Sequence, residues 1–205
     1  MERRDVLRML AASAGAGAAR GLIPSDLLAL GRAVHARVTT TARASIFSSH
    51  ASETVVAAAE RIIPASDTPG ATEARVNLFV DRMLADWYEP ADRDRFLAGL
   101  RELDAQSRAR HGRDFIACAH PEQDALLMAF DEEVAALRRA SPGDLVRQRL
   151  GNPDEHWFAM LKYLTVLGYC TSEVAQRRTL HQYPLPGRYE ACAPYEAASP
   201  GRAPS

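Results

Sequence analysis

The chain has 205 residues, of which 47% are hydrophobic and 25% are charged, and its formal net charge is -1. These values are typical of a globular domain that is large enough to bury a core. A nearly neutral chain without a basic stripe argues against a nucleic-acid partner.

The first thirty residues, 1–30, have the pattern of an export signal. Arg3 and Arg4 are adjacent, Leu7 follows, and residues 9–19 form a weakly apolar run of about eleven residues that is rich in Ala and Gly. The alternative is an N-terminal helix with two incidental arginines, because arginine pairs recur at 138–139 and 177–178. The place of the first pair, directly before an uncharged run, favours the twin-arginine route, which carries folded proteins.

This signal predicts a periplasmic protein that meets the twin-arginine translocase. The apolar run is too short for a membrane span, which needs about 20 residues. A cleavage site of the Ala-x-Ala kind is expected near residues 16–19.

After the signal, residues 31–50 lack a strong apolar period and are expected to form a linker. A helical domain is predicted over residues 51–183. Its first helix ends at Pro64 and has one apolar face, formed by Val55, Val56, Ala59, Ile62 and Ile63. Residues 67–70 (Asp-Thr-Pro-Gly) predict a turn, and residues 76–87 have the clearest amphipathic period in the chain.

Three more helices are expected in the second half of the domain. Pro90 suits the first turn of one helix, and Gly112 suits its end. Pro121 opens the next, with an inward face of Leu127, Phe130, Val134 and Leu137. Asp154 is a candidate cap for the last, whose apolar face is Trp157, Phe158, Leu161 and Leu164.

The predicted fold is therefore all-α, a compact array of about five or six helices. Residues 184–205 contain Pro184, Pro186, Gly187, Pro194 and Pro200, and they predict an extended, irregular C-terminal arm and tail. A domain of this size offers little surface on which such an arm could pack. We therefore expect the arm to lie on a partner.

No catalytic or cofactor motif of a common kind occurs in the sequence. CxxC, HExxH, GxSxG and the glycine-rich phosphate loop are all missing. His111 and His120 flank a loop that contains Cys118, which leaves a loop-borne metal site as a minor alternative to helix-end residues. Glu60 beside Arg61, and the acidic run 131–133, are best explained as solvated helix surface.

Three stretches in this order resemble the gluconate 2-dehydrogenase subunit 3 family, which comprises small subunits of bacterial periplasmic flavin dehydrogenases. The resemblance covers about residues 51–195. It rests on residues 60–71 (ERIIPASDTPGA), on residues 157–162 (WFAMLK) leading into 167–173 (LGYCTSE), and on residues 186–194 (PGRYEACAP).

The resemblance implies a partner with the catalytic machinery. Small subunits of this family travel with an FAD-containing catalytic subunit of the glucose-methanol-choline oxidoreductase family. The twin-arginine signal of the small subunit then exports both chains, and a c-type cytochrome commonly takes the electrons onward. The implied substrate is a sugar, a sugar acid or a glycoside, and no cofactor is expected in this chain.

The same resemblance singles out a few residues. Tyr169 and Tyr189 are candidate interface residues, although the structural explanation dominates for the motif around Tyr169. Cys192 belongs to the family motif, whereas Cys170 stands where relatives often have an aromatic residue. Cys192 is accordingly a candidate for a disulfide to the partner subunit, with a bridge to Cys170 or a free thiol as alternatives.

Two other classes of function stay open at this stage. One is a free-standing periplasmic helical protein that binds a small ligand. The other is an enzyme in its own right with an acid/base site that the spacing does not reveal.

Overall fold

A computed structural model describes residues 29–36, 46–140 and 156–180. These residues form helices and connecting turns and contain no strand, which confirms the all-α fold class. The helices are α3 (Ser49–Ile62), α4 (Val76–Trp87), α5 (Pro90–His111), the short 3-10 turn η2 (Phe115–Ala117), α6 (His120–Ala140), α8 (Trp157–Thr171) and α9 (Glu173–Arg178). A further helix spans residues 29–36.

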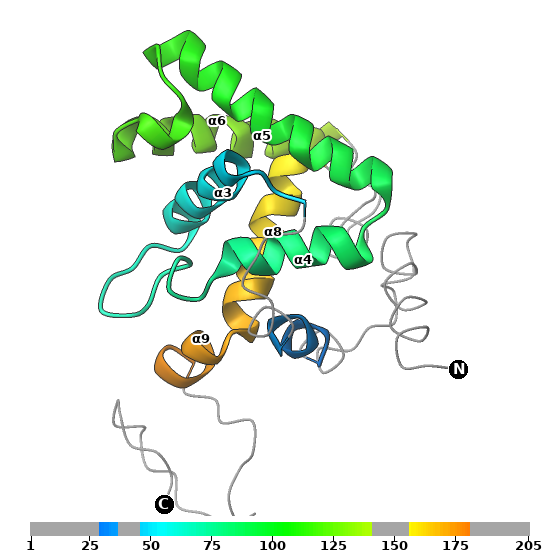
Figure 1. The fold of residues 1–205 in the computed structure, drawn as a ribbon. Coiled ribbons are helices and arrows are strands. Elements are labelled where there is room, and N and C mark those ends of the chain that lie inside the picture. The colour runs from blue at the N-terminus through cyan, green and yellow to red at the C-terminus, as the bar shows by residue number, and fades with distance from the viewer. Residues whose placement is uncertain (1–28, 37–45, 141–155, 181–205) are drawn as a thin grey trace, which may run out of the picture.

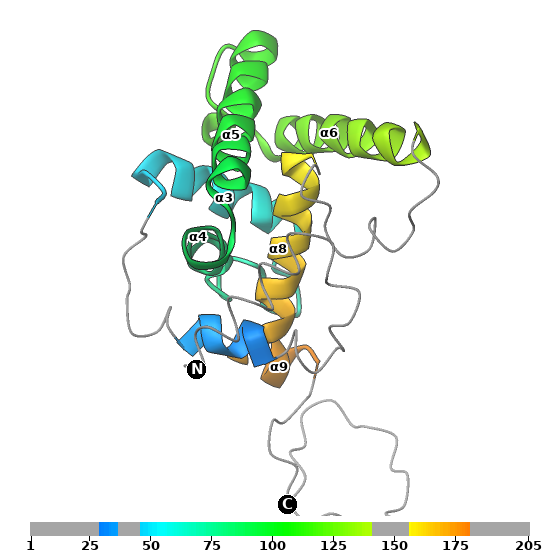
Figure 2. The ribbon, with the colours of Figure 1, turned by 90° about the vertical axis from the view of Figure 1, so that its right-hand side faces the viewer.

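Helix α8 is the centre of the fold. It contacts α3, α4, α5, α6 and α9, and Figures 1 and 2 show it running through the middle of the array. Lys162 is its one charged residue. As the sequence predicts, Trp157, Phe158, Leu161 and Leu164 are buried there. None of the helices in the described ranges is long and apolar enough to cross a membrane.

Local sequence signals set several helix ends. Helix α4 has the predicted bounds, and Pro90 lies at the start of α5, where its missing N–H is not needed. Gly112 ends α5 with φ 71°, a left-handed conformation that glycine adopts without steric cost. Ser172 caps α9, because its side chain accepts a hydrogen bond from the Ala175 N–H.

Two local predictions were wrong. The cap of α8 is His156, whose side chain accepts from the Phe158 N–H, and the predicted cap Asp154 lies outside the described residues. Leu137, predicted to face inward, is 57% exposed. Helix α6 extends sideways past the end of α8, so none of the helices in the described ranges lies beneath its last turns (Figure 2).

The predicted linker, residues 31–50, is partly helical. Residues 29–36 form a helix on the core, and Val34 within it is fully buried. The buried Asp81 on α4 then accepts hydrogen bonds from the N–H groups of Ile46 and Phe47, at 3.0 and 2.9 Å, and so holds the entry to α3. Leu30 and Val34 on this helix are four residues apart and both pack on the core, but the helix was missed because residues 31–50 as a whole lack a strong apolar period.

Candidate functional site

The first family-like stretch folds into a loop that the carboxylate of Glu60 holds together. Glu60 Oε1 accepts a hydrogen bond from the Ala65 N–H at 2.8 Å. Its Oε2 accepts from the backbone N–H and from the hydroxyl of Thr72, at 2.9 and 2.5 Å. Burial raises the pKa of the Glu60 carboxyl, but the hydrogen bonds from Thr72 and Ala65 outweigh it, so the pKa lies below its usual value.

Gly70 is required inside this loop. A Cβ atom at Gly70 would lie 2.6 Å from the Ala65 nitrogen, and it would also meet the Glu60 carboxylate. Glu60 and Arg61, expected to lie on a solvated helix surface, make separate contacts in this arrangement. Arg61 instead makes a two-pronged ion pair with Asp124 on α6, at 2.6 and 2.8 Å.

The second family-like stretch supports the first. The Tyr169 hydroxyl donates to the Pro69 carbonyl at 2.7 Å and lies 2.9 Å from the Thr179 hydroxyl. Tyr169 itself is only 5% exposed. The residue predicted as a candidate interface contact is therefore a buried support of the loop in this chain.

We predict that Glu60→Ala destabilises the protein by about 1–2 kcal/mol. Each of the lost hydrogen bonds contributes about 0.5–1.5 kcal/mol, but water can bond the freed Ala65 and Thr72 groups at this surface and so recovers part of the loss. Urea unfolding measures the change. Glu53→Ala is the matched control on the same helix, since Glu53 bonds the exposed Ser49 hydroxyl. Equal effects of the two substitutions would contradict the role given to Glu60.

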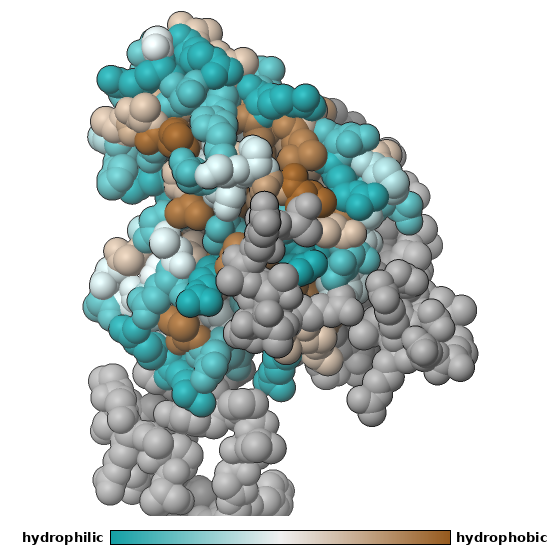
Figure 3. All heavy atoms as spheres, viewed as in Figure 1, coloured by the Kyte–Doolittle hydropathy of each residue, from teal (hydrophilic) through white to brown (hydrophobic). Residues whose placement is uncertain are grey.

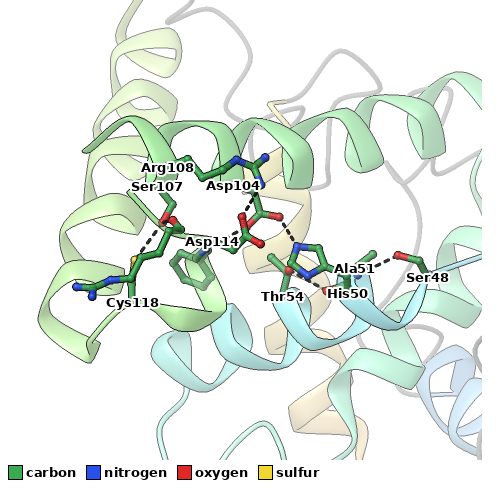
Figure 4. A network of polar contacts seen from close by, with 11 residues as sticks. Ser48, His50, Ala51, Thr54, Asp104, Ser107, Arg108, Asp114 and Cys118 are labelled. Atoms are coloured by element: carbon green, nitrogen blue, oxygen red, sulfur yellow. Dashed lines mark hydrogen bonds and ion pairs between the residues drawn. The ribbon is translucent and has the colours of Figure 1, made fainter. Parts of the chain in front are cut away.

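A groove of about 440 Å³ lies between the start of α3 and α5. Its lining is apolar at Ile46, Leu97 and Leu100 and polar at His50, Asp94 and Arg101. Figure 4 shows His50 reaching from α3 to Asp104 on α5. The His50 Nε2 and Asp104 Oδ2 atoms are 2.6 Å apart, and the side chains are 45% and 7% exposed.

A chain of polar contacts holds Asp104 in place behind the groove (Figure 4). Its Oδ1 accepts from the Phe115 N–H at 3.0 Å. One turn further along α5, the Ser107 hydroxyl donates to the Arg113 carbonyl at 2.8 Å and lies 3.1 Å from the Cys118 sulfur. These contacts fix η2 against α5 and leave the Asp104 carboxylate aimed at His50.

An imidazole oriented by a carboxylate can bind or transfer a proton. The two hydroxyls that line the groove are already engaged: Ser48 accepts from the Ala51 N–H, and Thr54 donates to the His50 carbonyl. The arrangement therefore supports a pH-dependent link between α3 and α5 better than nucleophilic catalysis. Sequence reasoning missed this pair, because His50 and Asp104 are 54 positions apart on different helices.

We predict a pH-dependent contribution of His50 to stability. The hydrogen bond to Asp104 raises the pKa of His50, against a smaller opposing effect of burial. A histidine whose pKa is raised on folding stabilises fully below its unfolded pKa of about 6.5 and loses that effect as the pH rises through the folded pKa. The loss of stability in His50→Gln should thus be largest below about pH 6.5. NMR titration checks the cause, and a His50 pKa at or below 6.5 would contradict it.

The structure does not bring the residues of the minor metal hypothesis together. Cys118 is buried against Ser107, and His111 Nδ1 lies 3.6 Å from Glu122 Oε1. Within the described ranges no group of three or more His, Cys, Asp and Glu side chains is placed to hold a metal ion. In the acidic run, Asp131 makes an ion pair with Lys162 of α8 at 2.6 Å, while Glu132 and Glu133 are exposed.

The remaining predicted residues divide into two groups. Cys170 is a half-buried free thiol whose pKa burial raises, and Cys118 is also free. Arg3, Arg4, Leu7, Tyr189 and Cys192 lie outside the described residues.

On the face in Figure 3, hydrophobic residues lie in separate patches between hydrophilic ones. Among the residues that the structure describes, the exposed large hydrophobic side chains are Met128, Leu137, Val166 and Leu180.

The sequence was compared with family models, curated proteins and solved structures. A family model described as gluconate 2-dehydrogenase subunit 3 matches residues 49–187. No curated protein and no solved structure gave a significant match. The matched region runs from the first residue of α3 past the end of α9, and it includes Glu60, Gly70 and Tyr169. The chain therefore belongs to the gluconate 2-dehydrogenase subunit 3 family and is a small subunit of a dehydrogenase complex.

Proposed function

We propose that this chain is the non-catalytic small subunit of a bacterial periplasmic dehydrogenase whose catalytic subunit carries FAD. That catalytic subunit belongs to the glucose-methanol-choline oxidoreductase family and oxidises a sugar, a sugar acid or a glycoside. The family match over residues 49–187 is the observation that carries the proposal. The place of the family-like stretches supports it, because Glu60 and Tyr169 support a loop and the fold instead of lining a reaction site.

Helix α8 supports the need for a partner. Apart from Lys162, α8 has no charged side chain, and a helix this apolar is normally buried over most of its surface. In α8, however, Val166 is 48% exposed, and its neighbours Tyr163, Leu167 and Cys170 on the same side are only partly buried. A surface of this kind is better suited to a subunit of a complex than to a chain that acts alone.

The second part of the proposal concerns export. The twin-arginine signal with Arg3, Arg4 and Leu7 directs this chain to the translocase, and the folded flavoprotein crosses the membrane with it. In the periplasm the small subunit stabilises the catalytic subunit, and a c-type cytochrome accepts the electrons.

The isolated chain tests the non-catalytic assignment. We expect the purified small subunit to bind no FAD and to oxidise no sugar, because its sequence has no glycine-rich dinucleotide loop. Gel filtration followed by an absorbance spectrum measures bound flavin. A flavin band that stays with the isolated chain would contradict the proposal.

We predict that Cys192 forms a disulfide with the catalytic subunit in the exported complex. Cysteines in an oxidising compartment tend to pair, and Cys192 belongs to the family-like arm motif, whereas Cys170 replaces an aromatic residue. Gel electrophoresis without reductant should show one band of both subunits that disappears in Cys192→Ser. Cys118→Ser is the matched control and should leave the band unchanged. Two separate bands in the absence of reductant would contradict the prediction, because Cys192 would then either bridge to Cys170 within this chain or remain a free thiol.

The groove between α3 and α5 favours a second candidate function, a free-standing periplasmic ligand-binding protein. Its volume of about 440 Å³ suits a small molecule, and its lining is apolar with a few polar groups. This function requires a monomer that works without a flavoprotein. Equilibrium sedimentation of the exported protein distinguishes the two candidates.

A further inference from the structure

Residues 29–36 form a helix that belongs to the folded core, although its first two residues lie within the predicted export signal, residues 1–30. Figure 2 shows this helix, in blue, beside the end of α8 that leads to α9. Val34 has no exposed surface. The His35 imidazole donates from Nε2 to the Gly168 carbonyl of α8 at 2.7 Å, and its ring stacks on Phe79 of α4 with the ring centres 4.8 Å apart.

Two glycines make this close packing of three helices sterically feasible. A Cβ atom at Gly31 would lie 2.5 Å from Thr171 Cβ at the end of α8. A Cβ atom at Gly168 would lie 2.7 Å from Phe79 Cδ1. Contacts this short leave no room for any side chain, so the helix is fitted to α4 and α8 and is not loosely attached.

Within residues 1–48 the sequence has Ala-x-Ala patterns, after which a signal peptidase could cut, in two places. The upstream patterns at the end of the apolar run are Ala14-Gly15-Ala16 and Ala16-Gly17-Ala18, which follow an overlapping Ala12-Ser13-Ala14 inside the run, and the downstream pattern is Ala42-Arg43-Ala44. The apolar run at residues 9–19 favours the upstream cut, but a downstream cut would also spare the family region. A mature chain that begins at Ser45 would keep the whole region matched by the family, which starts at residue 49.

We propose that the mature exported protein keeps helix 29–36, because the signal is removed at the upstream patterns and not after Ala44. This inference rests on the proposed twin-arginine export, in which the cargo is already folded when the peptidase meets it. The upstream patterns lie at the end of the apolar run, whereas the downstream pattern lies beyond a docked helix. A cut after Ala44 would also remove Val34 from the core and His35 from Phe79 and Gly168.

N-terminal sequencing of the chain purified from the periplasm tests the proposal. We expect the mature chain to begin at Gly17 or Ala19. A start at Ser45, any other start after Ala29, or an uncut periplasmic chain would overturn it. Ala44→Leu should leave the start unchanged, whereas Ala16→Leu, which alters both upstream patterns, should block or shift the cut.

A stability measurement on the uncut, full-length protein tests, independently of export, whether helix 29–36 is part of the folded core. Val34→Asp places a charge in the core and should lower the melting temperature by several degrees, whereas Arg32→Asp on the exposed side of the same helix should not. Equal melting temperatures for the two variants would overturn the proposal. A chain that stays in the cytoplasm while Val34→Asp is destabilised would instead count against the proposed export function.

Discussion

Replacing both signal arginines, Arg3→Lys together with Arg4→Lys, is expected to leave this chain and its flavoprotein in the cytoplasm. The translocase recognises two planar guanidinium groups as a pair, and the compact ammonium group of lysine does not reproduce their fork of donors. Nearly all dehydrogenase activity should therefore move from the periplasmic to the cytoplasmic fraction. Activity assays on fractionated cells measure the shift.

The chain provides its own control for this experiment. Arg138 and Arg139 form a second arginine pair far from the N-terminus, and changing both to lysine keeps the same composition as the signal variant. Export should be normal in this control. Normal periplasmic activity in the signal variant would rule out export of the catalytic subunit by this chain.

Gly99→Ala is expected to destabilise the fold by about 1–3 kcal/mol, the usual cost of overpacking a core. Gly99 lies on α5 where it meets α8, and an added Cβ would lie 2.6 Å from Trp157 Cβ and closer still to the indole ring. Trp157 cannot move aside easily, because its ring packs on Phe130 and Phe158 with centres 5.0 and 5.7 Å away. Alanine gains about 1 kcal/mol of helix propensity over glycine, which offsets part of the cost.

Thermal or urea unfolding measures this change in the free energy of unfolding. The control is Ala98→Leu, which adds more volume at an exposed position one residue earlier on the same helix. Ala98→Leu should leave stability nearly unchanged. A Gly99→Ala variant as stable as the wild type would show that α5 and α8 do not pack as closely as described.

The helices that the sequence predicts well are those whose ends and faces depend on local signals. Pro90 and Gly112 bound α5 through backbone geometry that any context would impose. Helix α4 was predicted with its bounds because six apolar residues recur at helical spacing along it. For these two helices, the conformation that the local sequence prefers is the same as the one that the folded structure requires.

The sequence is less informative where contacts join distant residues. Helix 29–36 has only the short apolar spacing of Leu30 and Val34, and its contacts with α4 and α8 through His35 join residues far apart in the sequence. The His50–Asp104 pair and the engagement of Glu60 with Thr72 likewise need the folded chain to bring their members together. Leu137 was predicted to face inward because its spacing fits the face of α6, but it is exposed near the end of that helix, which extends past the described part of α8.

Purification of this chain from the periplasm of cells that also express its flavoprotein tests the central claim most directly. An affinity tag at the C-terminus avoids the export signal. We expect FAD absorbance, sugar dehydrogenase activity and a second, larger subunit to elute together with the tagged chain. A tagged chain that elutes alone as a monomer, while the flavoprotein is exported and active without it, would contradict the claim.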